Sequence, residues 1–145
     1  MQIPQSHILT TRHLNRVFDK TVATYKYYWF LGILDLFVRQ GKTRINVWEI
    51  MVTMVANAWY PVIYFRLSFG KSESLYEAIL ALQKEYNIPI NISVRDLTDL
   101  LKELIQRPDV RKRLNFLQMN VPFRFLRPWI DTSDDRQTVI RSQTF

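Results

Sequence analysis

The residue types that carry most acid–base and metal chemistry are few and scattered in this 145-residue chain. Its two histidines, His7 and His13, are spaced so that one helical face cannot hold both, unlike metal ligands four residues apart. The chain has no cysteine, which excludes disulfides, thiolate zinc sites and cysteine nucleophiles. Its three scattered glycines do not form a phosphate-binding loop. Asp134 and Asp135 lie in a polar stretch and are expected to be solvated. We therefore predict no catalytic residue, no metal site and no cofactor.

Positive charge is the chemical feature that stands out. The net charge is +7. Residues 1–45 carry seven Lys and Arg against two acids, residues 46–100 carry four against six, and residues 101–145 carry nine against five. Such a distribution favours nucleic acid or another polyanion as a partner. An ordinary basic protein with solvated lysines accounts for the same numbers, and the composition does not separate the two interpretations.

The candidate nucleic-acid contacts come from both basic ends of the chain. Three of them, Arg12, Arg16 and Lys20, recur every four residues, as the residues of one basic helical face do. Two others, Arg124 and Arg127, alternate with Phe123, Phe125 and Trp129, which is typical of a stacking platform. We favour the alternative that these aromatic side chains pack inward while the arginines point to solvent. The candidates are Arg12, Arg16, Lys20, Arg111, Lys112, Arg113, Arg124 and Arg127.

The element that would anchor this surface is a predicted helix over residues 20–40. It is apolar almost all round, apart from Lys26 and one narrow polar stripe, so we expect it to be buried at the centre of a bundle. Gly32 lies on the stripe and would let another backbone approach closely. Asp35 and Arg39 are four residues apart and can pair. We expect the Lys26 ammonium to reach water.

The remaining chain predicts further helices with readable ends. Asn46 and Glu49 form a capping-box pattern, and Pro61 should break or kink that helix near Trp59. The apolar residues that follow suggest a short helix, with a strand as the alternative. Later helices are predicted to begin at Ser72 or Ser74, at Ser93 with Asp96, and at Pro108.

After these helices the character of the chain changes. The stretch "NVPFRFLRPWI" over residues 120–130 contains two prolines and is predicted to be an extended arm. The predicted fold is therefore all-α: a single-domain irregular helical bundle of five to seven helices with an extended C-terminal arm. Residues 1–130 form the predicted domain, and residues 131–145 form a polar tail or a linker to a missing domain.

Membrane insertion is not expected. Residues 21–38 contain Lys26 and Asp35, and residues 50–65 are short and interrupted by Pro61, whereas a span needs about 20 predominantly apolar residues. The N-terminus lacks the pattern of a secretory signal. These features, with the absence of cysteine, lead us to expect a cytoplasmic protein.

Four aromatic-rich stretches carry a family resemblance. They are "VATYKYYWFLGILDLF" at 22–37, "WEIMVTMVANAWYPVIYFRLSFGKSESL" at 48–75, "NIPINIS" at 87–93 and "NVPFRFLRPWI" at 120–130. In these the chain resembles the N-terminal helical region of bacterial HNH endonuclease domain-containing proteins. The resemblance implies a two-part nuclease whose second part uses histidines and a divalent metal. No histidine follows His13, so the nuclease motif is absent here and no catalytic residue carries over.

Two functions remain open from the sequence. The first is a non-catalytic helical module that contacts DNA or RNA, or that positions a C-terminal nuclease domain in cis. The alternative is a protein–protein interaction or oligomerisation module without nucleic-acid binding, since a chain with 14% aromatic residues can leave an apolar patch for a partner.

Overall fold

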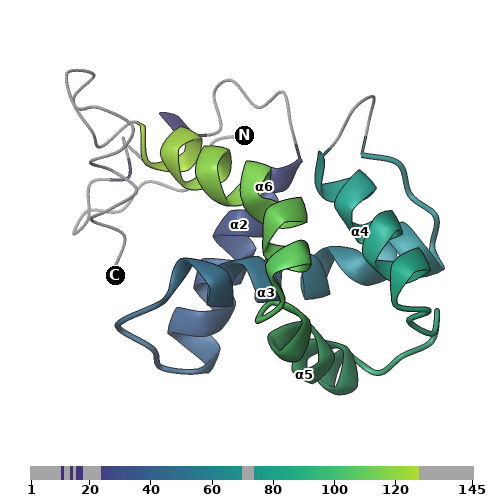
Figure 1. Ribbon diagram of the computed structural model, residues 1–145. Helices are drawn as coiled ribbons and strands as arrows, with labels where there is room; N and C mark the ends of the chain where they lie inside the picture. The colour runs from purple at the N-terminus through teal and green to yellow at the C-terminus, as the bar shows by residue number, and fades with distance from the viewer. Residues whose placement is uncertain (1–10, 12–13, 15, 18–23, 70–73, 128–145) are drawn as a thin grey trace.

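The computed structural model describes residues 11, 14, 16–17, 24–69 and 74–127, which contain five α-helices, two π-helical turns and no strand (Figure 1). The prediction of an all-α bundle is confirmed. Within the same ranges, no helix combines the length and the apolar character that crossing a bilayer requires. The elements are α2 (Tyr25–Leu34), η1 (Asp35–Arg39), α3 (Val47–Trp59), η2 (Tyr60–Tyr64), α4 (Ser74–Glu85), α5 (Val94–Leu104) and α6 (Pro108–Leu126).

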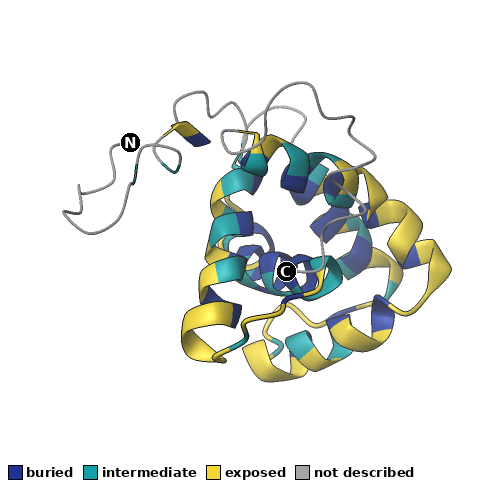
Figure 2. Cartoon of the chain, turned by 90° about the vertical axis from the view of Figure 1, so that its left-hand side faces the viewer, coloured by how far each residue is buried: buried dark blue, intermediate teal, exposed yellow. Residues whose placement is uncertain are grey.

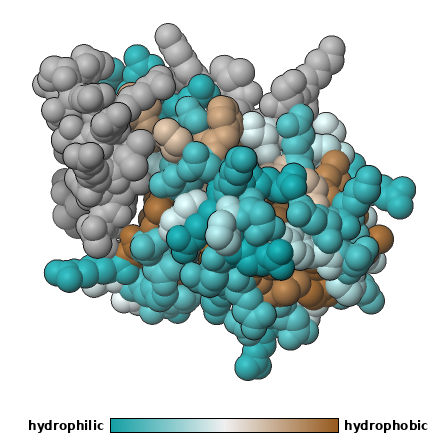
Figure 3. Space-filling view, in the orientation of Figure 1, coloured by the Kyte–Doolittle hydropathy of each residue, from teal (hydrophilic) through white to brown (hydrophobic). Residues whose placement is uncertain are grey.

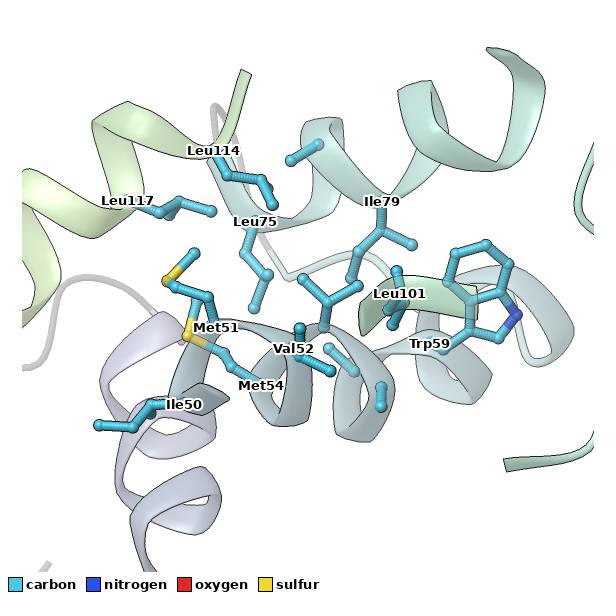
Figure 4. Packing of buried hydrophobic residues seen from close by; sticks show 14 of the residues in the cluster. Ile50, Met51, Val52, Met54, Trp59, Leu75, Ile79, Leu101, Leu114 and Leu117 are labelled. Atoms are coloured by element: carbon cyan, nitrogen blue, oxygen red, sulfur yellow. The ribbon is translucent and has the colours of Figure 1, made fainter. Parts of the chain in front are cut away.

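The helix buried most completely is α3, and not the predicted central helix over residues 20–40. Eight of the 13 residues of α3 are buried, and α3 contacts α2, α4, α5 and α6. Figure 4 shows side chains of α3, among them Met51 and Val52, meeting Leu75 and Ile79 of α4 and Leu114 of α6. The core therefore forms around α3, and the other helices pack against its sides.

The start of α3 forms as its sequence predicts. The Asn46 side chain accepts a hydrogen bond from the backbone N–H of Trp48 at 2.8 Å, and the Glu49 carboxylate accepts one from the N–H of Asn46 at 3.0 Å. This capping box satisfies N–H groups that a helix start leaves without partners. It also fixes Trp48 and Glu49 at the surface end of α3.

The far end of α3 shows the effect of Pro61. The α-helix ends at Trp59, and the chain continues as the π-helical turn η2, in which the N–H of Phe65 reaches the carbonyl of Tyr60 at 2.9 Å. Proline has no N–H to donate to the preceding turn, and its ring crowds the carbonyl of that turn, which disfavours a regular α-helix at this point. The predicted break near Trp59 is confirmed. No strand follows in the described residues, so the alternative of a strand there is wrong up to Phe69.

The helix α2 was predicted to be buried because it is apolar almost all round, apart from its narrow polar stripe. In the structure it buries part of that stripe and exposes some of its apolar side chains. Its buried residues are Tyr25, Trp29 and Gly32, and the next turn buries Asp35 and Leu36, so two positions of the polar stripe face the protein interior. A stripe of large apolar side chains is exposed instead. This apolar stripe consists of Tyr27, Leu31, Leu34, Phe37 and Val38.

The small and polar residues of the stripe explain this orientation. A Cβ placed on Gly32 would lie 3.2 Å from Cγ2 and 3.3 Å from the carbonyl oxygen of Ile50, so glycine permits the close approach of α2 to α3. Asp35 is the only buried charged residue in the described part of the chain, and its carboxylate accepts from Asn57 of α3 at 2.7 Å and pairs with Arg39 at 3.2 Å. The predicted close approach and ion pair are both confirmed.

The helices α4 and α5 follow the ordinary pattern of a surface helix. Ser93 caps α5 by accepting from the N–H of Asp96 at 3.1 Å, as predicted. Leu97, Leu101 and Leu104 are buried on one side of α5, and its charged residues are exposed on the other. Figure 2 shows buried faces turned toward the middle of the bundle and exposed faces turned outward.

The prediction of an extended C-terminal arm is wrong for residues 120–126, which belong to the helix α6. Pro122 lies inside that helix, although the stretch was predicted to be extended because of its prolines. Packing outweighs the lost hydrogen bond, since Val121, Pro122 and Phe125 are buried and the Phe125 ring lies 5.8 Å from that of Phe30. Residues 128–145, with the predicted domain boundary and the tail, lie outside the described residues.

Candidate functional site

The site begins where the chain leaves η1 and turns back toward α3. Gly41 has a φ of 64°, a left-handed conformation that glycine adopts without strain. The N–H of Lys42 donates to the carbonyl of Leu36 at 3.1 Å and closes this turn. The turn carries Lys42 back to the start of α3, where Asn46 and Glu49 form the capping box.

Lys42 and Glu49 form an ion pair across this turn. The hydrogen bond from Lys42 holds the pKa of the Glu49 carboxyl below its usual value, with smaller contributions from the N–H of Asn46 and from the positive charge of Lys102 on α5. Glu49 therefore stays ionised and is itself placed by the helix cap. The paired lysine remains close to the protein surface, with its side chain 38% exposed.

Arg111, in the first turn of α6, lies on the other side of Trp48. Its Nε donates to the carbonyl of Ile105 at 2.7 Å, and one terminal nitrogen donates to the Gln106 side chain at 3.3 Å. Its guanidinium carbon lies 5.3 Å from the centre of the Trp48 ring, within the range of a cation–π interaction. Arg111 is thus held in one position.

These groups line a pocket of about 310 Å³, which we call the Trp48 pocket. Among the described residues, three cations line it, Lys42 from the loop after η1, Lys102 from α5 and Arg111 from α6, together with one acid, Glu49. The residues that line the pocket come from the chain after η1, α3, α5 and the turn that leads into α6. Lys102 also pairs with Asp99 at 2.9 Å, but it is 63% exposed at the surface.

The chemistry of the Trp48 pocket is that of anion binding. Lysine and arginine side chains from separate segments can neutralise one anionic group together, and arginine donates two hydrogen bonds in a fixed geometry. The one carboxylate is already bonded to a lysine and to a backbone N–H. Among the described residues, no group of three or more His, Asp or Glu side chains is arranged to hold a metal ion. His7 and His13, which the sequence did not favour as ligands, lie outside those residues.

Of the predicted nucleic-acid contacts that the structure describes, only Arg111 lines the pocket. Arg113 is paired with Glu85 of α4 at 2.6 Å, and Arg124 donates to the hydroxyl of Tyr25 at 2.7 Å, so both tie α6 to neighbouring helices. Lys112 and Arg127 are exposed. Two of the predicted contacts on α6 therefore also hold this helix against its neighbours.

The predicted N-terminal basic face is described in part. Arg16 is exposed, whereas Arg12 and Lys20 lie outside the described residues. On the C-terminal side, Phe125 packs inward, as favoured over a stacking platform, although it does so in a helix and not in an extended arm. Trp129 lies outside the described residues.

A second group of cations lies near the C-terminal end of α6. The Lys26 ammonium donates to the carbonyl of Val17 at 3.0 Å, and its side chain is partly buried. Burial lowers the pKa of Lys26, and the nearby charges of Arg124 and Arg127 lower it further. These three cations repel one another and are separate from the Trp48 pocket.

Sequence reasoning missed Lys42, Lys102 and Trp48 as site residues. The capping-box pattern fixed the position of Trp48, but nothing local indicated that a residue 54 positions away on α5 would join it. A charge at residue 42 and another at residue 102 become neighbours of one pocket only through the packing of α5 against α3.

Comparisons with known proteins add no relative to this description. No protein-family model, no curated protein and no solved structure matches the chain. The geometry of the Trp48 pocket and the charge of the chain are therefore the features that bear on function.

Proposed function

We propose that the chain is a non-catalytic helical module that contacts nucleic acid, with the Trp48 pocket as a phosphate-binding part of its surface. The observation that carries this proposal is that Lys42, Lys102 and Arg111 line one pocket from three separate segments, with Arg111 over the Trp48 ring. Cations gathered in this way bind phosphate through charge and hydrogen bonds without reading a base sequence.

The overall charge supports the same proposal. A net charge of +7 steers polyanions toward the protein, and binding by phosphate contacts weakens as salt rises. The resemblance to the front region of HNH-type nucleases supports a role beside a nuclease domain in cis, with nucleic acid, DNA or RNA, as the shared partner. A cytoplasmic location is part of this proposal.

The test is a titration of fluorescently labelled nucleic acid at low and moderate salt. Lys102→Gln removes one pocket cation, and Lys84→Gln on α4 removes the same charge away from the pocket. We expect Lys102→Gln to weaken binding and to reduce the salt dependence by about one phosphate contact, and Lys84→Gln to do so less. No binding of any nucleic acid at low salt would contradict the proposal.

A second candidate function rests on the apolar stripe of α2 and η1. Phe37 is 55% and Val38 69% exposed, and Tyr27, Leu31 and Leu34 continue the stripe with spacings of four and three residues. This spacing is that of a helix seam that packs against another helix. It favours the protein-interaction module that the sequence left open. Figure 3 shows one face of the molecule, which is mainly hydrophilic with hydrophobic side chains in separate patches.

Light scattering distinguishes this second candidate. Leu31→Glu interrupts the apolar stripe, and Leu80→Glu on α4 changes a leucine of nearly equal exposure, 39% against 40%, outside it. A dimer that is insensitive to salt and is lost in Leu31→Glu but kept in Leu80→Glu supports an interaction module. A monomer at all concentrations removes self-association from the proposal.

A further inference from the structure

We infer that the Trp48 pocket accepts a nucleoside phosphate, that is, the base and the phosphate of one unpaired nucleotide. This inference rests on the proposed function, because it names the ligand of the same site. The chemistry is shared by a free nucleotide and by a nucleotide within a single strand. Three observations point to it: the size of the pocket, the mixture of groups on its walls and the position of Glu49.

The size of the pocket matches a small ligand. Its volume of about 310 Å³ lies at the lower end of the roughly 300–1,000 Å³ that ligand pockets occupy. In a duplex the bases are stacked in the interior of the double helix. A base can enter such a pocket only if its nucleotide is extruded, which costs unstacking energy. An unpaired base can enter without that cost, so the concave shape favours single strands.

The walls offer more than an anion needs. Apolar surface comes from Leu36, Val52 and Ile105, and flat aromatic surface comes from Trp48. Inorganic phosphate makes no use of such groups, whereas a nucleobase has an apolar face that packs on them. A ligand that satisfies these walls therefore carries a flat ring next to its anionic group.

Hydrogen-bonding groups between these walls suit the edges of a base. The hydroxyls of Thr53 and Thr98 each donate to a carbonyl of their own helix, which leaves their oxygens as acceptors toward the pocket. The side-chain amide of Gln40 adds both a donor and an acceptor. Base edges present donors and acceptors together, and phosphate oxygens only accept.

The position of Glu49 orients the ligand. Its carboxylate lies with Lys42 at the start of α3, and it repels a phosphate placed beside it. Lys102 and Arg111 come from α5 and α6 and are free of a direct bond to this acid. The phosphate is therefore assigned to Lys102 and Arg111, and the base to the side of Trp48 and Glu49, where the carboxylate can accept from an exocyclic amine.

The experiment follows the indole N–H resonance of Trp48 in isotope-labelled full-length protein, assigned with Trp48→Phe. The probes are nucleoside monophosphates, inorganic phosphate, a single-stranded oligonucleotide and a duplex of the same sequence. We expect a monophosphate to shift this resonance and to displace the single strand at a concentration about tenfold lower than inorganic phosphate requires. Lys102→Gln should weaken monophosphate binding about five- to tenfold, and Lys84→Gln less than about twofold.

The possible results separate this inference from the proposed function. Monophosphates that bind no more tightly than inorganic phosphate overturn the inference, while salt-dependent binding of oligonucleotides would still support the proposed function. A duplex that binds as tightly as the single strand and leaves the Trp48 resonance unchanged also overturns it. Monophosphate binding without any oligonucleotide binding supports the nucleotide as ligand and contradicts the nucleic-acid function.

Discussion

The helices α2 and α5 both pack against α3, but they differ in how strictly they separate buried apolar from exposed polar side chains. In α5 the leucines face the core and the charged residues face solvent. In α2 a glycine and, in the following turn, an aspartate face α3, while large apolar side chains are exposed. The difference teaches that apolar residues of a helix are buried only where a partner surface reaches them, and that close approach of two backbones can select the small residues instead.

The largest expected effect in this comparison is the loss of a core leucine from α5. Leu97 is fully buried, so Leu97→Ala should lower the free energy of unfolding by about 2–5 kcal/mol through lost burial and a cavity. Leu31→Ala on the apolar stripe should lower it by less than about 1 kcal/mol, because that side chain is already partly in water. Urea unfolding curves of the two variants measure the difference. Equal losses would show that the stripe is covered in solution.

The next largest expected effect is the loss of Asp35, the buried carboxylate in the turn that follows α2. Asp35→Ala leaves the Asn57 amide and the Arg39 guanidinium without their acceptor, which should lower the free energy of unfolding by about 1–3 kcal/mol. Asp99→Ala on α5 removes an exposed pair with Lys102, and its unfolding curve should be hard to tell from that of the wild type. Chemical denaturation at neutral pH compares the two. A harmless Asp35→Ala would contradict the role assigned to the polar stripe.

A smaller effect tests the close approach itself. Gly32→Ala places a methyl group against the Ile50 carbonyl, which can move only with its backbone, so overpacking should cost about 1–3 kcal/mol. Alanine regains about 1 kcal/mol of helix propensity, so the expected net loss is about 1 kcal/mol. Thermal unfolding followed by circular dichroism measures it. An increase in the melting temperature would show that α2 and α3 have room to separate.

The same contrast explains what the sequence could predict. Caps at Asn46 and Ser93 and the break at Pro61 depend on a few neighbouring residues, and they are confirmed. The face that α2 buries depends on α3, and the helical course of residues 120–126 depends on the contact of Phe125 with Phe30. Tertiary contacts of this kind have no local signal.

The candidate site follows the same division. Arg111 was predicted as a contact from its charge alone, and the structure places it over the ring of Trp48. Lys102 escaped notice because it looks like any exposed lysine on the polar face of an amphipathic helix. Only the folded arrangement of α3, α5 and α6 shows that these side chains line one pocket.

The smallest expected effect is electrostatic and lies between the two regions, at Glu49. Lys42 from the α2 side and Lys102 from α5 both lower the pKa of this carboxyl, and the hydrogen bond from Lys42 is the largest cause. A carboxyl whose pKa is lower in the folded state than in the unfolded state stabilises the fold at pH values above its unfolded-state pKa. This stabilisation is lost as the pH falls through the folded-state pKa. Lys42→Gln should therefore raise the pKa of Glu49 toward its ordinary value, and Lys102→Gln should raise it less. Side-chain carboxyl chemical shifts followed through an acid titration measure both.

Because Glu49 is partly exposed, we expect the accompanying change in stability at neutral pH to be a few tenths of a kcal/mol, about the size of a surface ion pair. A larger shift in Lys102→Gln than in Lys42→Gln would mean that the α5 side, and not the α2 side, sets the charge state of the pocket.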